Sequence, residues 1–147
     1  MRLLLLALVI TFLSNTGFSG TDYSKDLDYD AKTGLIVIDD KARDHIVGDG
    51  LMSIMFEAAA EVVLNGYREV TGIRFSEIEP GSIYDLVGLR NGDVVTMIDG
   101  QFVTGIAHVM DLVEDLKRRD TFTYMVLRKP PNPFENPKTL GFKVVVR

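Results

Sequence analysis

Three aspartates at alternate positions are the first residues in this chain whose types and spacing could do chemistry. Asp26, Asp28 and Asp30 have the carboxylate spacing that opens a calcium-binding loop. Such a loop also needs a glycine at its sixth position and a bidentate carboxylate at its twelfth, where this chain has Ala31 and Val37. We therefore expect no metal here and interpret the segment as a solvated acidic linker.

Residues for covalent or acid–base catalysis are sparse. The sequence contains no Gly-x-Ser-x-Gly and no His-Glu-x-x-His pattern, and its only histidines are His45 and His108. It contains no cysteine, which excludes thiol chemistry and disulfides. Ser82 is interpreted as a helix cap, and helix-end and turn roles explain Asp85 and Asp93. We expect a protein that is not an enzyme and needs no cofactor.

Size and charge narrow the choice of partner. The chain has 147 residues, of which 46% are hydrophobic and 25% charged, a balance typical of one globular domain with one core. Its formal net charge is −5. Binding to nucleic acid needs clustered lysines and arginines that neutralise phosphates, so we expect no nucleic-acid partner.

The most regular pattern of the chain runs from Glu79 to Gly100. Pro80-Gly81-Ser82 predicts a turn and the start of a short helix, which Gly88 ends. Asn91-Gly92 and Asp99-Gly100 are turn pairs that accept positive φ at low cost, and the apolar run between them predicts a buried strand. A turn, a helix, a second turn and a strand thus follow one another directly.

Periodicity and turn residues predict the remaining elements. Gly34–Ile38 is typical of a short strand, and Lys41–Val63 is compatible with two helical pieces interrupted at Gly48-Asp49-Gly50. Asn65-Gly66 between apolar residues predicts a hairpin. The later predicted elements are a strand at Thr71–Ile78, a helix at Ile106–Arg119, strands at Thr121–Arg128 and Leu140–Arg147, and a stiff proline-rich hairpin loop at Lys129–Lys138.

The pattern from Glu79 to Gly100 resembles the signature of PDZ domains, which bind peptides by adding them to a sheet edge. This resemblance implies that Thr71–Ile78 holds the carboxylate-binding loop and its strand. Successive backbone N–H groups must converge on a peptide carboxylate there, and a glycine leaves room for them. The implied peptide-binding residues are Gly72, Ile73, Arg74, Phe75 and Ser76 on the strand, with Val109 and Val113 on the Ile106–Arg119 helix as the second wall.

The order of elements is similar to the bacterial form of the PDZ family, above all to the PDZ region of protein C of type II secretion systems. Gly72-Ile73-Arg74, Pro80-Gly81-Ser82 and Gly88–Val94 carry this resemblance. It implies an α+β fold: a single PDZ-like domain, built as a small, partly open β-barrel or sandwich that is flanked by helices and has the bacterial strand order.

The first 20 residues differ from the rest of the chain. Arg2 precedes an apolar run from Leu3 to Leu13 and a small, polar tail, which predicts a signal peptide at residues 1–20, or alternatively a short signal anchor. A polar linker at residues 21–34 and the PDZ-like domain with a helical lead-in at 35–147 follow. We expect a periplasmic or exported protein. The alternative is an inner-membrane anchor with the domain facing the periplasm, and only an uncleaved segment would contact the membrane.

Two functions stay open at this point. The first is a non-enzymatic PDZ module of the cell envelope, linked to type II protein secretion, that recruits a substrate or partner by β-augmentation. The second is a regulatory PDZ partner of a separate periplasmic protease. The expected partners are a peptide segment or an exported protein, with a secretion-system component as a further candidate.

Overall fold

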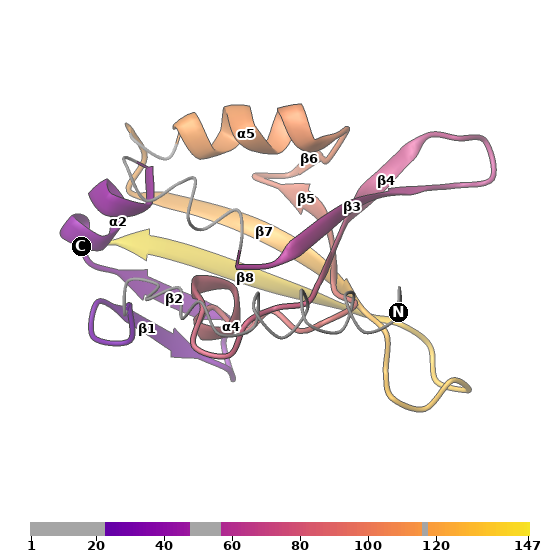
Figure 1. Cartoon of the computed structure of the whole chain (residues 1–147), viewed down its shortest axis with the longest axis horizontal. Helices are drawn as coiled ribbons and strands as arrows, with labels where there is room; N and C mark the ends of the chain where they lie inside the picture. The colour runs from indigo at the N-terminus through magenta and orange to yellow at the C-terminus, as the bar shows by residue number, and fades with distance from the viewer. Residues whose placement is uncertain (1–22, 48–56, 116–117) are drawn as a thin grey trace, which may run out of the picture.

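Eight strands form one curled, open sheet in the part of the chain that the computed structural model describes, residues 23–47, 57–115 and 118–147 (Figure 1). The strand order is β1-β2-β8-β7-β5-β4-β3, and β6 pairs with β5 off this path. β2 and β8 run parallel, and the other neighbouring pairs are antiparallel. The strands are β1 (Leu27–Asp30), β2 (Leu35–Ile38), β3 (Ala59–Leu64), β4 (Val70–Ser76), β5 (Val94–Ile98), β6 (Gln101–Phe102), β7 (Thr121–Arg128) and β8 (Lys138–Val146).

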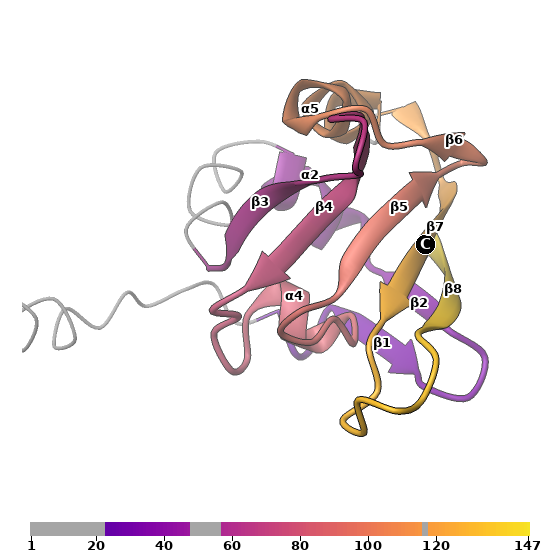
Figure 2. The same ribbon diagram turned by 90° about the vertical axis from the view of Figure 1, so that its right-hand side faces the viewer.

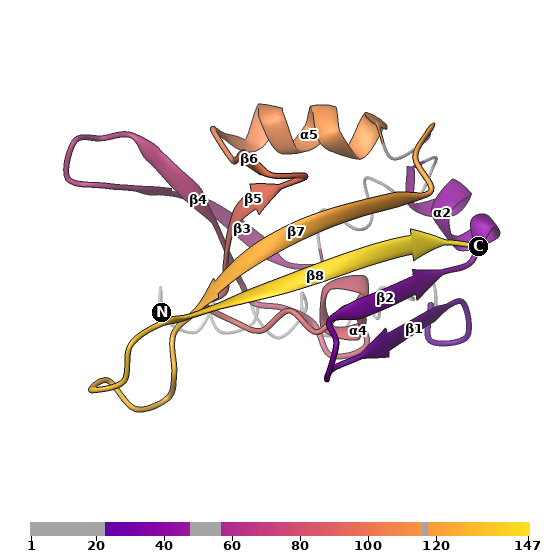
Figure 3. The ribbon, with the colours of Figure 1, turned by 180° about the vertical axis from the view of Figure 1, so that it is seen from behind.

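Within the described ranges, three helices accompany this sheet: α2 (Asp40–Val47), α4 (Ile83–Leu86) and α5 (Ile106–Asp115). Figures 1, 2 and 3 place α5 and α4 at opposite ends of the curled sheet. α2 is held at the end of β8, where the Asp40 N–H donates to the Arg147 carbonyl at 3.0 Å. The prediction of a single α+β domain, with a partly open sheet and short helices, is confirmed.

The core lies inside the curl of the sheet and draws on most of the strands. Tyr124 of β7 and Phe142 of β8 stack with nearly parallel rings whose centroids lie 4.8 Å apart, within the range of favourable aromatic contacts. These two strands pair with each other from Thr121 to Arg128 of β7 and form the long central hairpin of the sheet. The most deeply buried apolar side chains of the core are Tyr23, Ile36, Ile73, Val103, Val126 and Val144.

The short helix α4 forms as the sequence predicts. The Ser82 hydroxyl accepts the Asp85 N–H at 3.3 Å, which satisfies one donor of the first turn. Gly88 follows the helix with a φ of 82°, a conformation that favours glycine. A Cβ atom at this position would also collide with the Tyr29 ring. Gly88 is therefore required both by its backbone conformation and by the close approach of β1.

The predicted turn at Asp99-Gly100 and the predicted hairpin at Asn65-Gly66 are both confirmed, with different turn geometries. Asp99 and Gly100, both with positive φ, form a two-residue turn between β5 and β6. The hairpin between β3 and β4 has a longer loop, in which the positive φ falls on Arg68. The Asn65 carboxamide oxygen organises this loop by accepting the N–H groups of Tyr67 and Glu69 at 2.9 and 3.0 Å.

The prediction of a linker at residues 21–34 is wrong for its described part. Tyr23 is only 2% exposed, and β1 pairs antiparallel with β2. Leu27 and Tyr29 pack against the core while Asp28 lies in solvent. The alternating aspartates therefore mark the solvent face of an amphipathic strand. This segment is part of the sheet and not an acidic linker.

The prediction of helix up to Val63 is also wrong, because β3 begins at Ala59. Ala59, Ala60 and Glu61 have good helix propensity, but pairing with β4 prevails over it. The break at Gly48-Asp49-Gly50 and the signal segment at residues 1–20 lie outside the described residues.

Candidate functional site

The structure separates the predicted site residues into two elements. Residues 72–76 all lie on β4, and Val109 and Val113 both lie on α5. The side chain of Val113 is outside the described part of the structure. Whether a peptide binds between these elements depends on which strand edge is open.

Both edges of β4 are occupied. Ile73 pairs with Val62 of β3 on one side and with Val95 of β5 on the other. Phe75 is enclosed in the same way, because its N–H donates to the Asp93 carbonyl at 2.9 Å while Ala60 lies opposite it on β3. A strand with two neighbours has no backbone groups left for a peptide. The prediction that β4 receives the ligand by β-augmentation is therefore wrong in this structure.

Gly72 serves packing in β4 and lies in no loop that could bind a carboxylate. A Cβ atom built on Gly72 would lie 2.6 Å from both the Val95 carbonyl oxygen and a methyl group of Val94. Real Cβ atoms do not approach other heavy atoms this closely, so only glycine lets β4 and β5 meet here. The close approach of β4 and β5 therefore requires a residue without a side chain at position 72.

Arg74 has a partner within the hairpin. Its guanidinium donates to the Glu61 carboxylate of β3 at 2.7 Å, and both side chains are substantially exposed. Glu61 and Arg74 are opposite each other in the β3–β4 register. This cross-strand pair lies on the face of the hairpin that points away from the core, because Ile73 next to it is buried.

The open edge belongs to β3, which is a terminal strand of the sheet. Both the N–H and the carbonyl of Phe75 are bonded on the β5 side, to Asp93 and Gly92. Because these groups alternate in direction along a strand, those of Arg74 face β3 and meet Glu61. By the same alternation, the backbone groups of the residues on either side of Glu61, Ala60 and Val62, point away from β4. They form the free edge within the described structure.

Two apolar side chains accompany this free edge. Val62 is 39% exposed and Leu64 is 53% exposed. Val62 lies opposite the buried Ile73, so its side chain is on the core-facing side of the hairpin. Exposed apolar side chains beside unpaired backbone groups are the features that a strand-adding ligand uses. Sequence reasoning missed them because it assigned Ala59–Val63 to a helix.

The α5 side of the predicted groove is partly described. Val109 is half-buried and packs against the core cluster, and Ile106 at the start of the helix is 45% exposed. The His108 Nδ1 atom accepts the Thr104 N–H at 3.3 Å, so this histidine caps the entry to the helix. Of these two apolar residues, Ile106 is more exposed than Val109 and therefore more accessible to a ligand.

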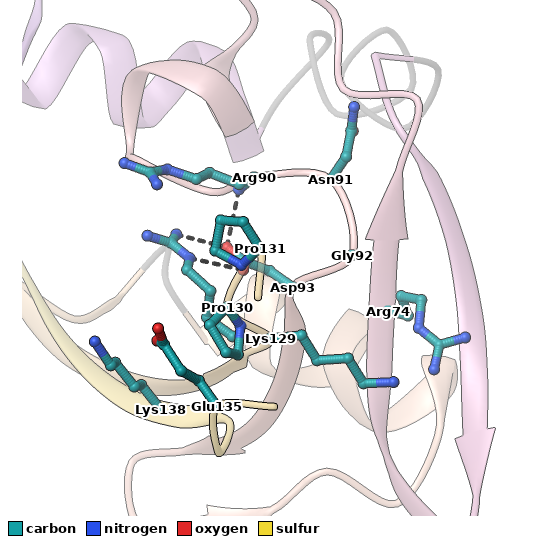
Figure 4. Close-up of a pocket in the computed structure, with 11 residues that line it drawn as sticks. Arg74, Arg90, Asn91, Gly92, Asp93, Lys129, Pro130, Pro131, Glu135 and Lys138 are labelled. Carbon is teal, nitrogen blue, oxygen red and sulfur yellow. Dashed lines mark hydrogen bonds and ion pairs between the residues drawn. The ribbon is translucent and has the colours of Figure 1, made fainter. Parts of the chain in front are cut away.

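A buried ion pair joins the turn at Asn91-Gly92 to β7 (Figure 4). Asp93 is 1% exposed and receives two hydrogen bonds from Arg128, at 2.9 Å from Nε and 2.7 Å from Nη2. It also accepts the Arg90 N–H at 2.9 Å, and Arg128 donates to the Gly88 carbonyl at 2.8 Å. The hydrogen bonds that Arg128 donates to the Asp93 carboxylate raise the pKa of Arg128 above its ordinary value. Asp93 is thus a structural carboxylate, and both of its oxygens accept hydrogen bonds from the protein.

A second buried carboxylate lies at α4. Glu57 is 8% exposed and accepts the Ile83 N–H at 3.1 Å, so its charge lies at the start of the helix. Burial, and secondarily the charge of Glu57, raise the pKa of the Tyr84 hydroxyl to about 12. Tyr84 is therefore a neutral phenol at physiological pH, and its ring packs on Phe75 with centroids 5.4 Å apart.

No group of three or more His, Cys, Asp or Glu side chains in residues 23–47, 57–115 and 118–147 could hold a metal ion. None of the helices in these ranges is long and apolar enough to cross a bilayer.

No family model matches the chain, and no curated protein matches it. Solved PDZ domains of type II secretion proteins match its structure. Residues 204–305 of EpsC from Vibrio cholerae align with a TM-score of 0.49 and 17% identity over 72% of this chain and 92% of theirs. The shorter fragment, residues 219–305, gives 0.44 and 16% over 63% and 97%. The PDZ domain of the pullulanase C protein from Klebsiella pneumoniae, in complex with a fatty acid, gives 0.42 and 16% over 68% and 94%. Such a likeness concerns the fold and gives no residue of this chain a role.

Proposed function

We propose that this chain is a non-enzymatic protein-binding domain that captures an extended peptide segment by strand addition at the outer edge of β3. The observation that carries the proposal is the position of β3 at the end of the sheet, with the N–H and carbonyl groups of Ala60 and Val62 directed away from β4. Main-chain hydrogen bonds would supply most of the affinity, and the exposed Val62 and Leu64 would select apolar residues of the ligand.

The side chains that could serve catalysis support a binding role. Ser82 caps α4, Asp85 accepts the Gly81 N–H at 2.8 Å, and His108 caps the entry to α5. Each of these groups is explained by local structure and none is joined to another in a catalytic arrangement.

The envelope location and the link to type II secretion rest on the sequence. The apolar segment at residues 3–13 supports export, and Gly72-Ile73-Arg74 with Gly88–Val94 supports the resemblance to secretion protein C. The captured segment would then belong to an exported protein or a component of the secretion machine. Regulation of a separate periplasmic protease is the second candidate. Co-purification of the protein from cells with secretion components or with a protease distinguishes the two.

The strand-addition proposal is tested by NMR titration of the ¹⁵N-labelled protein with extended peptides carrying free or amidated carboxyl ends. We expect shifts at Ala60 and Val62 that exceed those on β4, with affinities of about micromolar because a short peptide must be ordered. Ala60→Pro removes one outward donor and should abolish these shifts, while Ala60→Val keeps the donor and should preserve them.

A second substitution tests the direction of the edge itself. The Glu61 N–H faces β4, so Glu61→Pro should destabilise the fold, whereas Ala60→Pro should leave it nearly unchanged. A folded Ala60→Pro variant that binds as well as the original would exclude the β3 edge. The absence of shifts with every peptide would remove peptide capture as the function.

A further inference from the structure

A second surface, separate from the β3 edge, gathers positive charge in a protein whose net charge is negative. A pocket of about 480 Å³ opens between β4, the turn at residues 90–93 and the loop that joins β7 to β8 (Figure 4). Its lining includes five basic residues and only two acidic ones, Asp93 and Glu135. The basic residues are Arg74, Arg90, Arg128, Lys129 and Lys138.

Most of this charge is available to a ligand. Arg128 is engaged by the buried Asp93, and Arg74 is shared with the exposed Glu61. The side chains of Arg90, Lys129 and Lys138 have no ion-pair partner among the described residues. Three uncompensated cations around one cavity create a local positive potential despite the formal net charge of −5.

The cations are distributed over two ends of the pocket. In Figure 4 the side chain of Arg90 extends toward the end where Lys138 lies, whereas Lys129 extends the opposite way, toward the side of Arg74. Pro130 and Pro131 lie between these ends. A single small anion needs donors that converge on one point. This arrangement suits a ligand with two or more negative groups that are spaced along a chain.

The proline wall is held in place by its own loop. The Asn132 carboxamide oxygen accepts the Phe134 N–H at 3.1 Å, and the Asn132 carbonyl accepts the Glu135 N–H at 3.1 Å. Prolines restrict the backbone further, so the wall loses little entropy when a ligand binds. The rings of Pro130 and Pro131 offer an apolar contact between the two charged ends.

We propose that this pocket binds an extended acidic peptide segment, with carboxylates at both ends of the pocket and an intervening residue against the prolines. The charge complementarity of Arg90, Lys129 and Lys138 carries the proposal. The site is independent of strand addition, because the three cations that carry it, Arg90, Lys129 and Lys138, lie outside β3 and the ligand needs no free backbone groups. A partner protein could occupy both surfaces.

The proposal is tested by fluorescence anisotropy with a labelled six-residue peptide that contains four glutamates, its glutamine counterpart, and inorganic phosphate as competitor. We expect the acidic peptide to bind with an affinity that falls as salt rises, and the glutamine peptide to bind at least about tenfold more weakly. Phosphate should compete poorly. Full competition by millimolar phosphate would instead establish a single-anion site, and equal binding of the glutamine peptide an apolar one; either result would overturn the proposal.

Variants assign the binding to this pocket. Arg90→Gln and Lys129→Gln each remove one charge from a different end, and the double variant should weaken the acidic peptide by about tenfold. Glu135→Gln should strengthen binding by about two- to threefold, because it removes an opposing charge from the lining. Lys41→Gln, on α2 at the far end of the sheet, changes the net charge as much as Arg90→Gln or Lys129→Gln alone and should have no effect (Figure 3). Unchanged affinity in the double variant would exclude the pocket.

Discussion

β3 and β4 are the two strands of one hairpin, but they differ in how many of their edges are paired. β4 is paired along both edges, and its Ile73 is 2% exposed. In the described part of the chain β3 is paired along one edge only, and none of its residues is buried. The distinctive residues Gly72-Ile73-Arg74 therefore lie on β4, which has a neighbour on each edge. β3, whose outer edge is open, consists of Ala59–Leu64 and has no distinctive motif.

This difference shows why a backbone-mediated site is hard to locate from side chains. Strand addition uses N–H and carbonyl groups that every residue except proline carries in full. The capacity to bind is then a property of position in the sheet, and the conspicuous glycine of this hairpin marks where two strands pack closely. Three experiments test this contrast, at Gly72 of β4, at the Asp93–Arg128 pair that holds the turn leading into the neighbouring β5, and at the Arg74–Glu61 pair that joins the two strands.

The largest effect is expected at Gly72. Gly72→Val places carbon atoms against the Val95 carbonyl oxygen and the Val94 side chain, so β4 and β5 must separate. We expect a loss of at least about 3 kcal/mol in the free energy of unfolding, measured by urea denaturation. The matched control is Gly66→Ala in the hairpin loop, where no atom lies within 4 Å of the new Cβ and φ is not positive. It should change stability by less than about 1 kcal/mol.

A stable Gly72→Val protein that had lost only its peptide binding would reverse this assignment. It would return Gly72 to a ligand-binding loop and would require β4 to have an open edge. The urea midpoint and the NMR titration, carried out on the same sample, separate these two outcomes.

The next effect concerns the ion pair that secures the turn before β5. Asp93→Asn keeps the shape of the side chain but leaves Arg128 without its negative partner in a site that is largely shielded from water. We expect a loss of about 3 kcal/mol, and a partial recovery when Arg128→Met is added, because the orphaned charge is then removed. Equal stability of Asp93→Asn and the unmodified protein would show that this pair does not hold the turn.

Local sequence signals predicted the part of the fold from Ser82 to Gly100 closely. Ser82, Gly88 and Asp99-Gly100 act through their own backbone or their near neighbours, so their roles can be inferred without knowing the rest of the chain. The match between Thr121–Arg128 and β7 has a similar origin, because strict alternation predicts a half-buried strand.

Features that depend on contacts distant in sequence could not be inferred in this way. Arg128 and Asp93 are 35 positions apart in the sequence, and the residues next to each of them do not predict that they pair. Ala59–Leu64 becomes a strand because β4 pairs with it, against a helix propensity that its alanines favour. The resemblance of Gly72-Ile73 to a carboxylate-binding loop places the predicted ligand on β4, and the assignment of Ala59–Val63 to a helix hides the neighbouring strand whose edge is open.

The smallest effect is expected for the ion pair that bridges the two strands. Arg74 and Glu61 are 2.7 Å apart, but their side chains are 37% and 60% exposed, so water and salt screen their attraction. A double-mutant cycle with Arg74→Gln and Glu61→Gln should give a coupling energy below about 1 kcal/mol, and added salt should reduce it further. The hairpin would then owe its register to backbone pairing and to the packing of Ile73 against the core. A coupling above about 2 kcal/mol would mean that the pair is shielded from water, which is incompatible with an exposed β3. The same cycle should leave the amide exchange rates of Ala60 and Val62 fast, because these N–H groups point away from both charged side chains and from β4.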